Sequence, residues 1–227
     1  MNSVLVKIWI AVLLAAIGAY GVFTALRMGG YFAAEDQPTE PAPKIVELKP
    51  GEDILTSLAD VKLVERSGAN LRWSELKGQP WVANIFFATC PKECILISHQ
   101  VRLLQHNTVG VRFVSITCDP ERDTPDALQK YAQQYQADPQ RWFFATGDMQ
   151  QIQRASEAIF GFGVKRVEHA PYLALIDRDG KFVGMYSGIS TQSMEELRAE
   201  LAKLLSPDRP QDAGRNAPAQ ETASKDP

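Results

Sequence analysis

The sequence predicts an α/β protein: one mixed β-sheet with helices on both faces, preceded by an N-terminal transmembrane helix. Three observations predict this class. Between residues 54 and 206, apolar strand-like segments alternate with amphipathic helical segments, and the last two strands form a hairpin. Residues 8–26 carry no charged side chain. Such alternation is typical of parallel strands joined by helices, and a hairpin adds antiparallel strands to the same sheet.

Length and composition limit the possible folds and partners. With 227 residues, 45% of them hydrophobic, the chain can form one domain of about 100–200 residues with additional segments. The formal net charge is −3, and the Lys and Arg residues are scattered along the chain. A nucleic-acid-binding surface needs a basic surplus to neutralise phosphates, so we expect no nucleic acid among the partners.

The uncharged N-terminal segment predicts a membrane anchor. Residues 8–26 are flanked by Lys7 and Arg27, and their length is close to the roughly 20 residues that a helix needs to cross a bilayer. A cleaved signal peptide is the alternative, but it would have a shorter apolar run and a better cleavage site than the following residues offer. The flanking charges are almost balanced, so the positive-inside rule gives no orientation.

The flanks of the predicted domain are polar. Residues 35–44 are rich in proline, and residues 206–227 contain almost nothing to bury. No internal repeat is apparent. We therefore expect a membrane anchor at 1–30, a flexible spacer at 31–56, the folded domain at 57–206 and a disordered tail at 207–227.

The first half of the domain predicts two strands, a helix and a third strand. Residues 61–66 and 78–88 have the apolar pattern of strands, and the second segment is apolar on both faces, as a central strand should be. A helical pattern follows over about 91–105. Residues 111–117 then give the next strand.

The second half continues the alternation. It starts with a helix that has Thr124 as N-cap and Pro125 at the first helical position. The remaining elements are a strand at 141–146, a helix at 149–160 capped by Asp148, a hairpin at 172–186 that turns at Asp179 and Gly180, and a helix at about 192–205. This order of elements is thioredoxin-like.

Two of the three cysteines stand where the central strand leads into a helix. Pro91 suits the first turn of that helix, which would place Cys90 at the helix mouth and Cys94 about one turn further in. Residues four apart on a helix face the same side, so the two sulfur atoms can share one ligand or form a strained disulfide. A helix N-terminus is also expected to lower a thiol pKa and stabilise the thiolate.

A structural disulfide is the other interpretation of this pair, and the number of cysteines alone would favour it in an extracytoplasmic domain. A bridge between residues so close in sequence, however, closes a very small loop and constrains little of the unfolded chain. The position of Cys90 and Cys94 therefore favours chemistry. Cys118 ends an apolar strand beside Asp119, and we expect it to be a buried thiol that packs as a small hydrophobic side chain.

The spacing of the cysteines separates two kinds of chemistry. Dithiol reductases with this fold carry two residues between their cysteines, whereas this chain carries three. Two thiolates with a third ligand form a trigonal pocket suited to copper(I), and an imidazole makes the pocket acceptable to copper(II). We expect His99 and His106 at the surface or at a helix boundary. His169 precedes a core strand and is the better candidate, at the same sheet edge as the cysteines.

The chain carries three separated motifs in one order: FFATCPKEC, SITCDPERDTP and VEHAPYLALIDRDGKFVG. Together they closely resemble the Sco/SenC proteins, which are membrane-anchored, thioredoxin-like copper proteins that help to assemble the binuclear copper centre of cytochrome c oxidase. The resemblance covers roughly residues 57–206, and it is specific because all three motifs occur in the right order.

The resemblance implies site residues and partners. By position, Cys90 and Cys94 match the paired copper ligands, which can also form a redox-active disulfide, and His169 matches the third ligand for copper(I) and copper(II). Asp119 begins an acidic loop near the site, where its carboxylate could orient a ligand; a turn residue before Pro120 is the equal alternative. The implied partners are a membrane and a cytochrome c oxidase subunit or a similar copper-accepting protein, with the folded domain outside the cytoplasm, on the periplasmic side.

The chain departs from the family pattern at three positions. Ile95 stands where many relatives have a second proline, and Lys92 where an acidic or small residue is common. Cys118 replaces what is usually an aliphatic residue and brings a third thiol close to the site. The matched metal ligands survive these changes, but the surface that meets a client protein differs.

Three hypotheses of function follow. The leading one is a membrane-tethered copper chaperone that delivers copper to a cytochrome c oxidase-type site. The second is a thiol–disulfide reductase with Cys90 as nucleophile and Cys94 as resolving thiol. The third is a membrane-tethered binding module with a structural disulfide. His169 separates the first two, because a reductase does not require it.

Overall fold

The computed structural model describes residues 3–28, 48–167 and 170–206. The chain divides into two compact units, residues 1–42 and residues 43–227.

The first unit is built around helix α1 (Ser3–Met28), so the predicted N-terminal helix is confirmed. Large apolar side chains are exposed along it, among them Trp9, Leu14 and Phe23. Within the described residues, no helix combines the length and the apolar content that crossing a membrane requires. The transmembrane helix predicted over residues 8–26 is therefore not found there.

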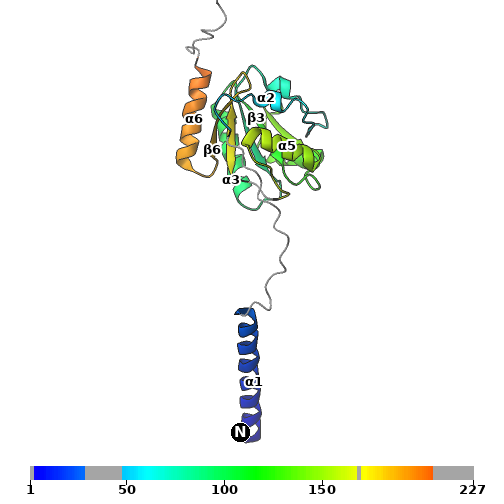
Figure 1. Ribbon diagram of the computed structural model, residues 1–227, viewed down its shortest axis with the longest axis vertical. Coiled ribbons are helices and arrows are strands. Elements are labelled where there is room, and N and C mark those ends of the chain that lie inside the picture. Colours follow the sequence, from blue (N-terminus) through cyan, green and yellow to red (C-terminus); the bar gives the residue numbers. More distant parts are fainter. Residues whose placement is uncertain (1–2, 29–47, 168–169, 207–227) are drawn as a thin grey trace, which may run out of the picture. The chain divides into compact units, whose positions relative to one another are not determined.

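The second unit forms, within its described residues, a six-stranded mixed sheet with helices on both faces, as predicted (Figure 1). The central strands β4 (Trp142–Thr146), β3 (Arg112–Thr117) and β2 (Trp81–Phe86) run parallel. The other strands, β1 (Val64–Glu65), β5 (Tyr172–Ile176) and β6 (Phe182–Ser187), are each antiparallel to their neighbour. Every residue of β2 is buried, as expected for a strand covered on both faces. The order of the strands in the sheet is β1, β4, β3, β2, β5 and β6.

Two groups of helices cover the two faces of this sheet, and Figure 1 shows α6 (Thr191–Leu205) and α5 (Met149–Phe160) on opposite sides of it. Successive strand residues point to opposite faces, so Phe86 of β2 packs with one group and Ile85 with the other. One face holds α6 together with α3 (Glu93–Asn107) and α4 (Pro125–Gln134), and the other holds α5 and the short α2 (Ile54–Ser57).

Local signals in the sequence account for where helices begin. Thr124 caps α4, since its side chain accepts a hydrogen bond from the N–H of Ala127. Asp148 caps α5 in the same way, with 2.9 Å between its Oδ1 and the nitrogen of Gln151. Both predicted caps are confirmed.

The predicted hairpin is confirmed as β5 and β6. Its turn contains Gly180 with φ of +87°, a backbone conformation that glycine adopts without strain. Residues before position 57 join this end of the fold: the N–H of Gly51 donates to the carbonyl of Phe182 at 2.8 Å, and Ile54 is buried.

Two predicted elements have different bounds in the structure. The strand expected over 61–66 pairs with β4 only at Val64 and Glu65, and the carbonyl of Leu63 instead accepts a hydrogen bond from the N–H of Leu71 at 2.8 Å. The helix expected from position 91 begins at Glu93, because the backbone of Lys92 (φ −144°, ψ −78°) is not helical. The second difference affects the cysteine pair.

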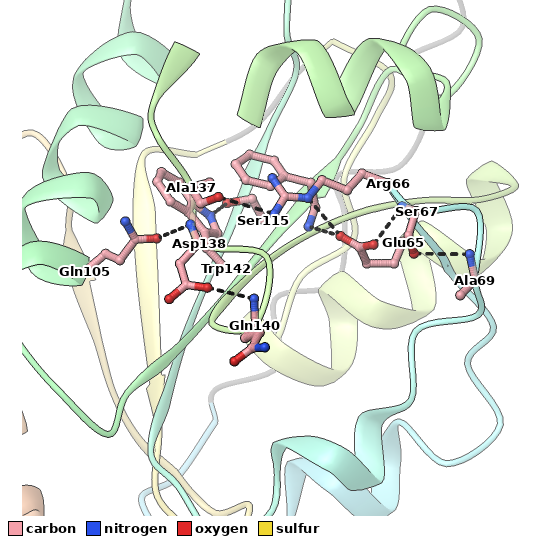
Figure 2. Close-up of polar contacts among 11 residues, drawn as sticks. Glu65, Arg66, Ser67, Ala69, Gln105, Ser115, Ala137, Asp138, Gln140 and Trp142 are labelled. Carbon is pink, nitrogen blue, oxygen red and sulfur yellow. Dashed lines mark hydrogen bonds and ion pairs between the residues drawn. The ribbon is translucent and has the colours of Figure 1, made fainter. Parts of the chain in front are cut away.

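Buried polar side chains link the parallel strands. Trp142 donates from Nε1 to Oγ of Ser115 at 2.9 Å (Figure 2), and Ser115 donates to Oδ1 of Asn84 at 2.7 Å. These residues lie on β4, β3 and β2, so one hydrogen-bonded chain crosses three adjacent strands. At the sheet edge, Arg66 pairs with Glu65 at 3.3 Å between Nε and Oε1 (Figure 2). Such satisfied polar contacts define the strand register on which the site depends.

Candidate metal centre

The cysteine pair lies between β2 and α3. Cys90 stands in the loop that connects them, and Cys94 is in the first turn of α3. The sequence predicted Pro91 inside the first helical turn, and this is wrong because α3 begins only at Glu93. The two cysteines are therefore not two positions of one regular helix.

The two residues nevertheless contact each other. The backbone nitrogen of Cys94 donates to Sγ of Cys90 at 3.4 Å, and the N–H of Cys90 donates to the carbonyl of Phe87 at 3.1 Å. Cys90 is 6% exposed and Cys94 is fully buried. The loop thus places two thiols side by side at the carboxyl end of β2, and Cys90 is the more exposed of the two residues.

Burial raises the pKa of the Cys94 thiol far above its usual range, and the hydrogen bond with Cys90 raises it further. The prediction that the helix N-terminus lowers a thiol pKa is wrong for Cys94, because removing the charged form from water outweighs the helix dipole. A metal ion that binds this thiolate must displace the proton. Metal uptake at the pair therefore releases protons.

Cys118 lies on the other face of the sheet. Its N–H extends the pairing of β3 with β2 by donating to the carbonyl of Phe86 at 2.8 Å. Its side chain is fully buried in the cluster that packs against α5, whereas Cys90 and Cys94 belong to the cluster that packs against α3. Burial raises the pKa of the Cys118 thiol to about 12. The prediction that Cys118 is buried and packs as a small hydrophobic side chain is confirmed.

Asp119 follows Cys118, and its carboxylate is fully buried. Nε of Arg166 donates to its Oδ1 at 2.8 Å, and Nη1 of Arg122 approaches its Oδ2 at 3.5 Å. Arg166 also pairs with Glu121 at 2.9 Å between Nη1 and Oε2. Because Arg166 precedes His169 by only three residues, Asp119 is tied to the segment that leads to the histidine.

His169 itself lies outside the described residues, but both flanks of its segment reach the cysteine end of the sheet. On one side, the N–H of Val167 donates to the carbonyl of Cys118 at 3.2 Å. Val167 has φ of +53°, which is unusual for a β-branched residue. On the other side, Leu173 at the start of β5 pairs with Asn84 of β2. The chain therefore approaches and leaves position 169 beside the ends of β3 and β2.

The other two histidines are on α3. The side chains of His99 and His106 are exposed, as predicted, and the ring of His99 meets Tyr135 edge-on at 5.4 Å between centroids. In the part of the chain that the structure describes, no three Cys, His, Asp or Glu side chains are grouped as metal ligands. Cys118 thus does not complete a three-cysteine site there.

Asp123 was not among the site residues predicted from the sequence. This residue is buried, and Oδ2 of its carboxylate accepts a hydrogen bond from the N–H of Ala88, in the Cys90 loop, at 3.0 Å. Thr117 at the end of β3 is its second partner. No spacing rule links position 123 to position 88, and only the pairing of β2 with β3 brings them together.

A family model described as SCO1/SenC matches residues 56–206. The chain belongs to the SCO1/SenC family. It is 29% identical to the SCO1 protein homolog of Bacillus subtilis over 147 residues, which cover 60% of this chain and 76% of that protein.

Solved structures of family members share its fold. A SCO1/SenC family lipoprotein from Bacillus anthracis is 26% identical, with a TM-score of 0.60 over 73% of this chain and 99% of that one. ScoI of Bradyrhizobium japonicum, solved with copper bound, is 25% identical, with a TM-score of 0.51 over 64% of this chain and 97% of that one. Both the predicted family and the thioredoxin-like fold are therefore confirmed.

We predict that Cys118→Ala retains the copper stoichiometry of the wild-type chain, because the thiol of Cys118 faces α5 and not the cysteine pair. Loss of the buried sulfur should lower the free energy of unfolding by about 1 kcal/mol. Metal analysis and thermal denaturation measure the two effects, and Cys94→Ala is the control that should lose copper. If Cys118→Ala folds by circular dichroism but takes up no copper, Cys118 is a ligand and its assignment to the core is incomplete.

Proposed function

We propose that this chain is a copper carrier that binds copper through Cys90, Cys94 and His169 and passes it by ligand exchange to a cytochrome c oxidase-type copper site. The observation that carries the proposal is the contact between Cys90 and Cys94 at the carboxyl end of β2. Family membership and the copper-bound relative support the same chemistry. Asp119 supports the site indirectly, by holding Arg166.

The donor set suits copper in both oxidation states. Two soft thiolates are good ligands for copper(I), and an added imidazole nitrogen makes a trigonal site that accepts copper(II). Position 169 suits the third ligand because the segments on both sides of it are held beside the ends of β2 and β3. Since copper is the cargo, a site that also releases it must keep one ligand within reach of the client. Cys90, the more exposed cysteine, suits that role.

We place the carrier at a membrane, with its folded domain outside the cytoplasm. The apolar side chains exposed along α1 need a nonpolar partner, and a lipid bilayer is the partner that best fits them. The similarity to a family lipoprotein supports attachment to a membrane. A site whose two thiols can be oxidised suits an extracytoplasmic compartment.

A thiol–disulfide reductase is the second candidate, and one contact favours it. The Cys94 N–H donates to Sγ of Cys90, the more exposed of the two cysteines, while burial raises the pKa of the Cys94 thiol. Cys90 would attack a client disulfide and Cys94 would then displace the client thiol. The pair would lose two electrons and two protons, which the client would gain.

The carrier predicts that copper binding depends on the redox state of the pair. The reduced full-length chain should bind one copper(I), whereas the chain oxidised to the Cys90–Cys94 disulfide should not, because a disulfide offers no thiolate ligands. Copper content after removal of loosely bound metal measures this difference, and re-reduction should restore uptake. Equal affinity in the oxidised and reduced chains would show that the copper site lies elsewhere.

Substitution of His169 separates the two candidates. His169→Ala should weaken copper(I) binding without abolishing it, because two thiolates satisfy copper(I), but it should remove or strongly change the thiolate-to-copper(II) charge-transfer band. Reduction of a model disulfide should hardly change, since thiolate attack does not need the imidazole. His99→Ala, on the exposed side of α3, is the matched control. An unchanged copper(II) spectrum together with lost reductase activity would favour the reductase.

A further inference from the structure

Asp123 joins two segments that are distant in the sequence. It lies in the loop after β3, immediately before the N-cap of α4, and is only 1% exposed. Its Oδ2 accepts a hydrogen bond from the N–H of Ala88, 35 residues away, at 3.0 Å. Ala88 precedes Cys90 by two residues. One buried side chain therefore holds the backbone of the loop that presents Cys90.

The carboxylate is itself held in place. Thr117 at the end of β3 is hydrogen-bonded to the same Oδ2, and its Oγ1 accepts from the N–H of Asp119 at 2.9 Å, which leaves the hydroxyl proton for Asp123. The N–H of Asp123 donates to the carbonyl of Asp119 at 2.9 Å. Asp123 is thus fixed to the end of β3 through its side chain and to the loop that follows β3 through its backbone.

Burying a carboxylate costs free energy unless hydrogen-bond donors replace the water molecules that it loses. Burial raises the pKa of Asp123 above its usual value, and the hydrogen bonds from Thr117 and Ala88 offset only part of this increase. Asp126, in the first turn of α4, is by contrast exposed. Asp126 therefore serves as a control carboxylate, three residues from Asp123. Among the hydrogen bonds of the described residues, none joins Asp126 to the Cys90 loop.

We propose that Asp123 is a positioning residue for the cysteine pair: its hydrogen bond to Ala88 holds the Cys90 loop so that the sulfur atoms of Cys90 and Cys94 face one shared ligand. Without this contact the loop samples more conformations, and the two sulfur atoms spend less time within reach of each other. Copper binding and disulfide formation both require that proximity, so both should weaken together. For copper, the inference rests on the proposed function; for the disulfide, it rests on the thiol pair alone.

The test uses the full-length chain with four substitutions. Asp123→Ala removes the acceptor, Asp123→Asn keeps an oxygen in place without the charge, and Asp123→Glu keeps the charge but displaces the oxygen. Asp126→Asn is the control. Two quantities are measured well below the unfolding temperature: copper(I) affinity by competition with a chelator, and the equilibrium constant of the Cys90–Cys94 disulfide with glutathione.

Asp123→Ala and Asp123→Glu should each lose about tenfold in both quantities, a typical effect of removing a residue that supports a metal ligand. Asp123→Asn should lie close to wild type, because its amide oxygen can still accept from Ala88, and Asp126→Asn should match wild type. A role in stability alone would lower the unfolding temperature but leave both constants unchanged. If Asp123→Ala does not fold, the comparison of Asp123→Asn with Asp123→Glu decides the question.

Two results would overturn the proposal. The first is wild-type constants in folded Asp123→Ala and Asp123→Glu. The second is an Asp123→Asn variant as weak as Asp123→Ala, which would assign the effect to the charge and not to the hydrogen bond. A wild-type chain that binds no copper would refute the proposed function instead, and the glutathione equilibrium would then decide the role of Asp123.

Discussion

The site depends on the parallel pairing of β2 with β3. This pairing aligns Phe86 with Thr117 and continues through the hydrogen bond from the Cys118 N–H to the Phe86 carbonyl. Parallel strands bring the loops at their carboxyl ends to the same edge of the sheet. The Cys90 loop and the loop of Asp119 and Asp123 therefore meet, although about 30 residues separate them in the sequence.

Burial then determines the chemistry of the thiols. A cysteine in water is partly ionised near neutral pH, but the pKa of Cys94 is raised because the domain core surrounds it. Metal binding at the pair must therefore be coupled to proton release, and oxidation to a disulfide removes the same protons by another route. Copper and the disulfide compete for one pair of sulfur atoms. A carrier can use this competition to bind copper only while its cysteines are reduced.

The elements of the fold were predictable from local signals, and the contacts around the site were not. Thr124, Asp148 and Gly180 mark helix starts and a turn through their own backbone chemistry, so their roles follow from short segments. The start of α3 was misjudged because the non-helical backbone of Lys92 has no marker in the sequence. The cysteine pair was recognisable from its spacing and its place after a buried strand.

Long-range contacts explain what the sequence could not reveal. Asp119 and Asp123 belong to one short acidic motif, yet one pairs with Arg166 and the other with the backbone of Ala88. The partner of each carboxylate depends on the path of the loop after β3. It also depends on the position of Arg166 in the segment before β5. The raised pKa of Cys94 likewise depends on packing, since the helix N-terminus alone predicts the opposite shift.

The number of sulfur atoms bound to copper tests the central claim most directly. X-ray absorption at the copper K-edge, measured on the reduced full-length chain with one equivalent of copper(I), should show two sulfur neighbours and one lighter nitrogen neighbour. Cys90→Ser should reduce the sulfur count by one, and Cys118→Ser should leave it unchanged. Three sulfur neighbours in the wild-type chain would contradict His169 as the third ligand, and a spectrum that does not respond to Cys90→Ser would contradict a site built on Cys90 and Cys94.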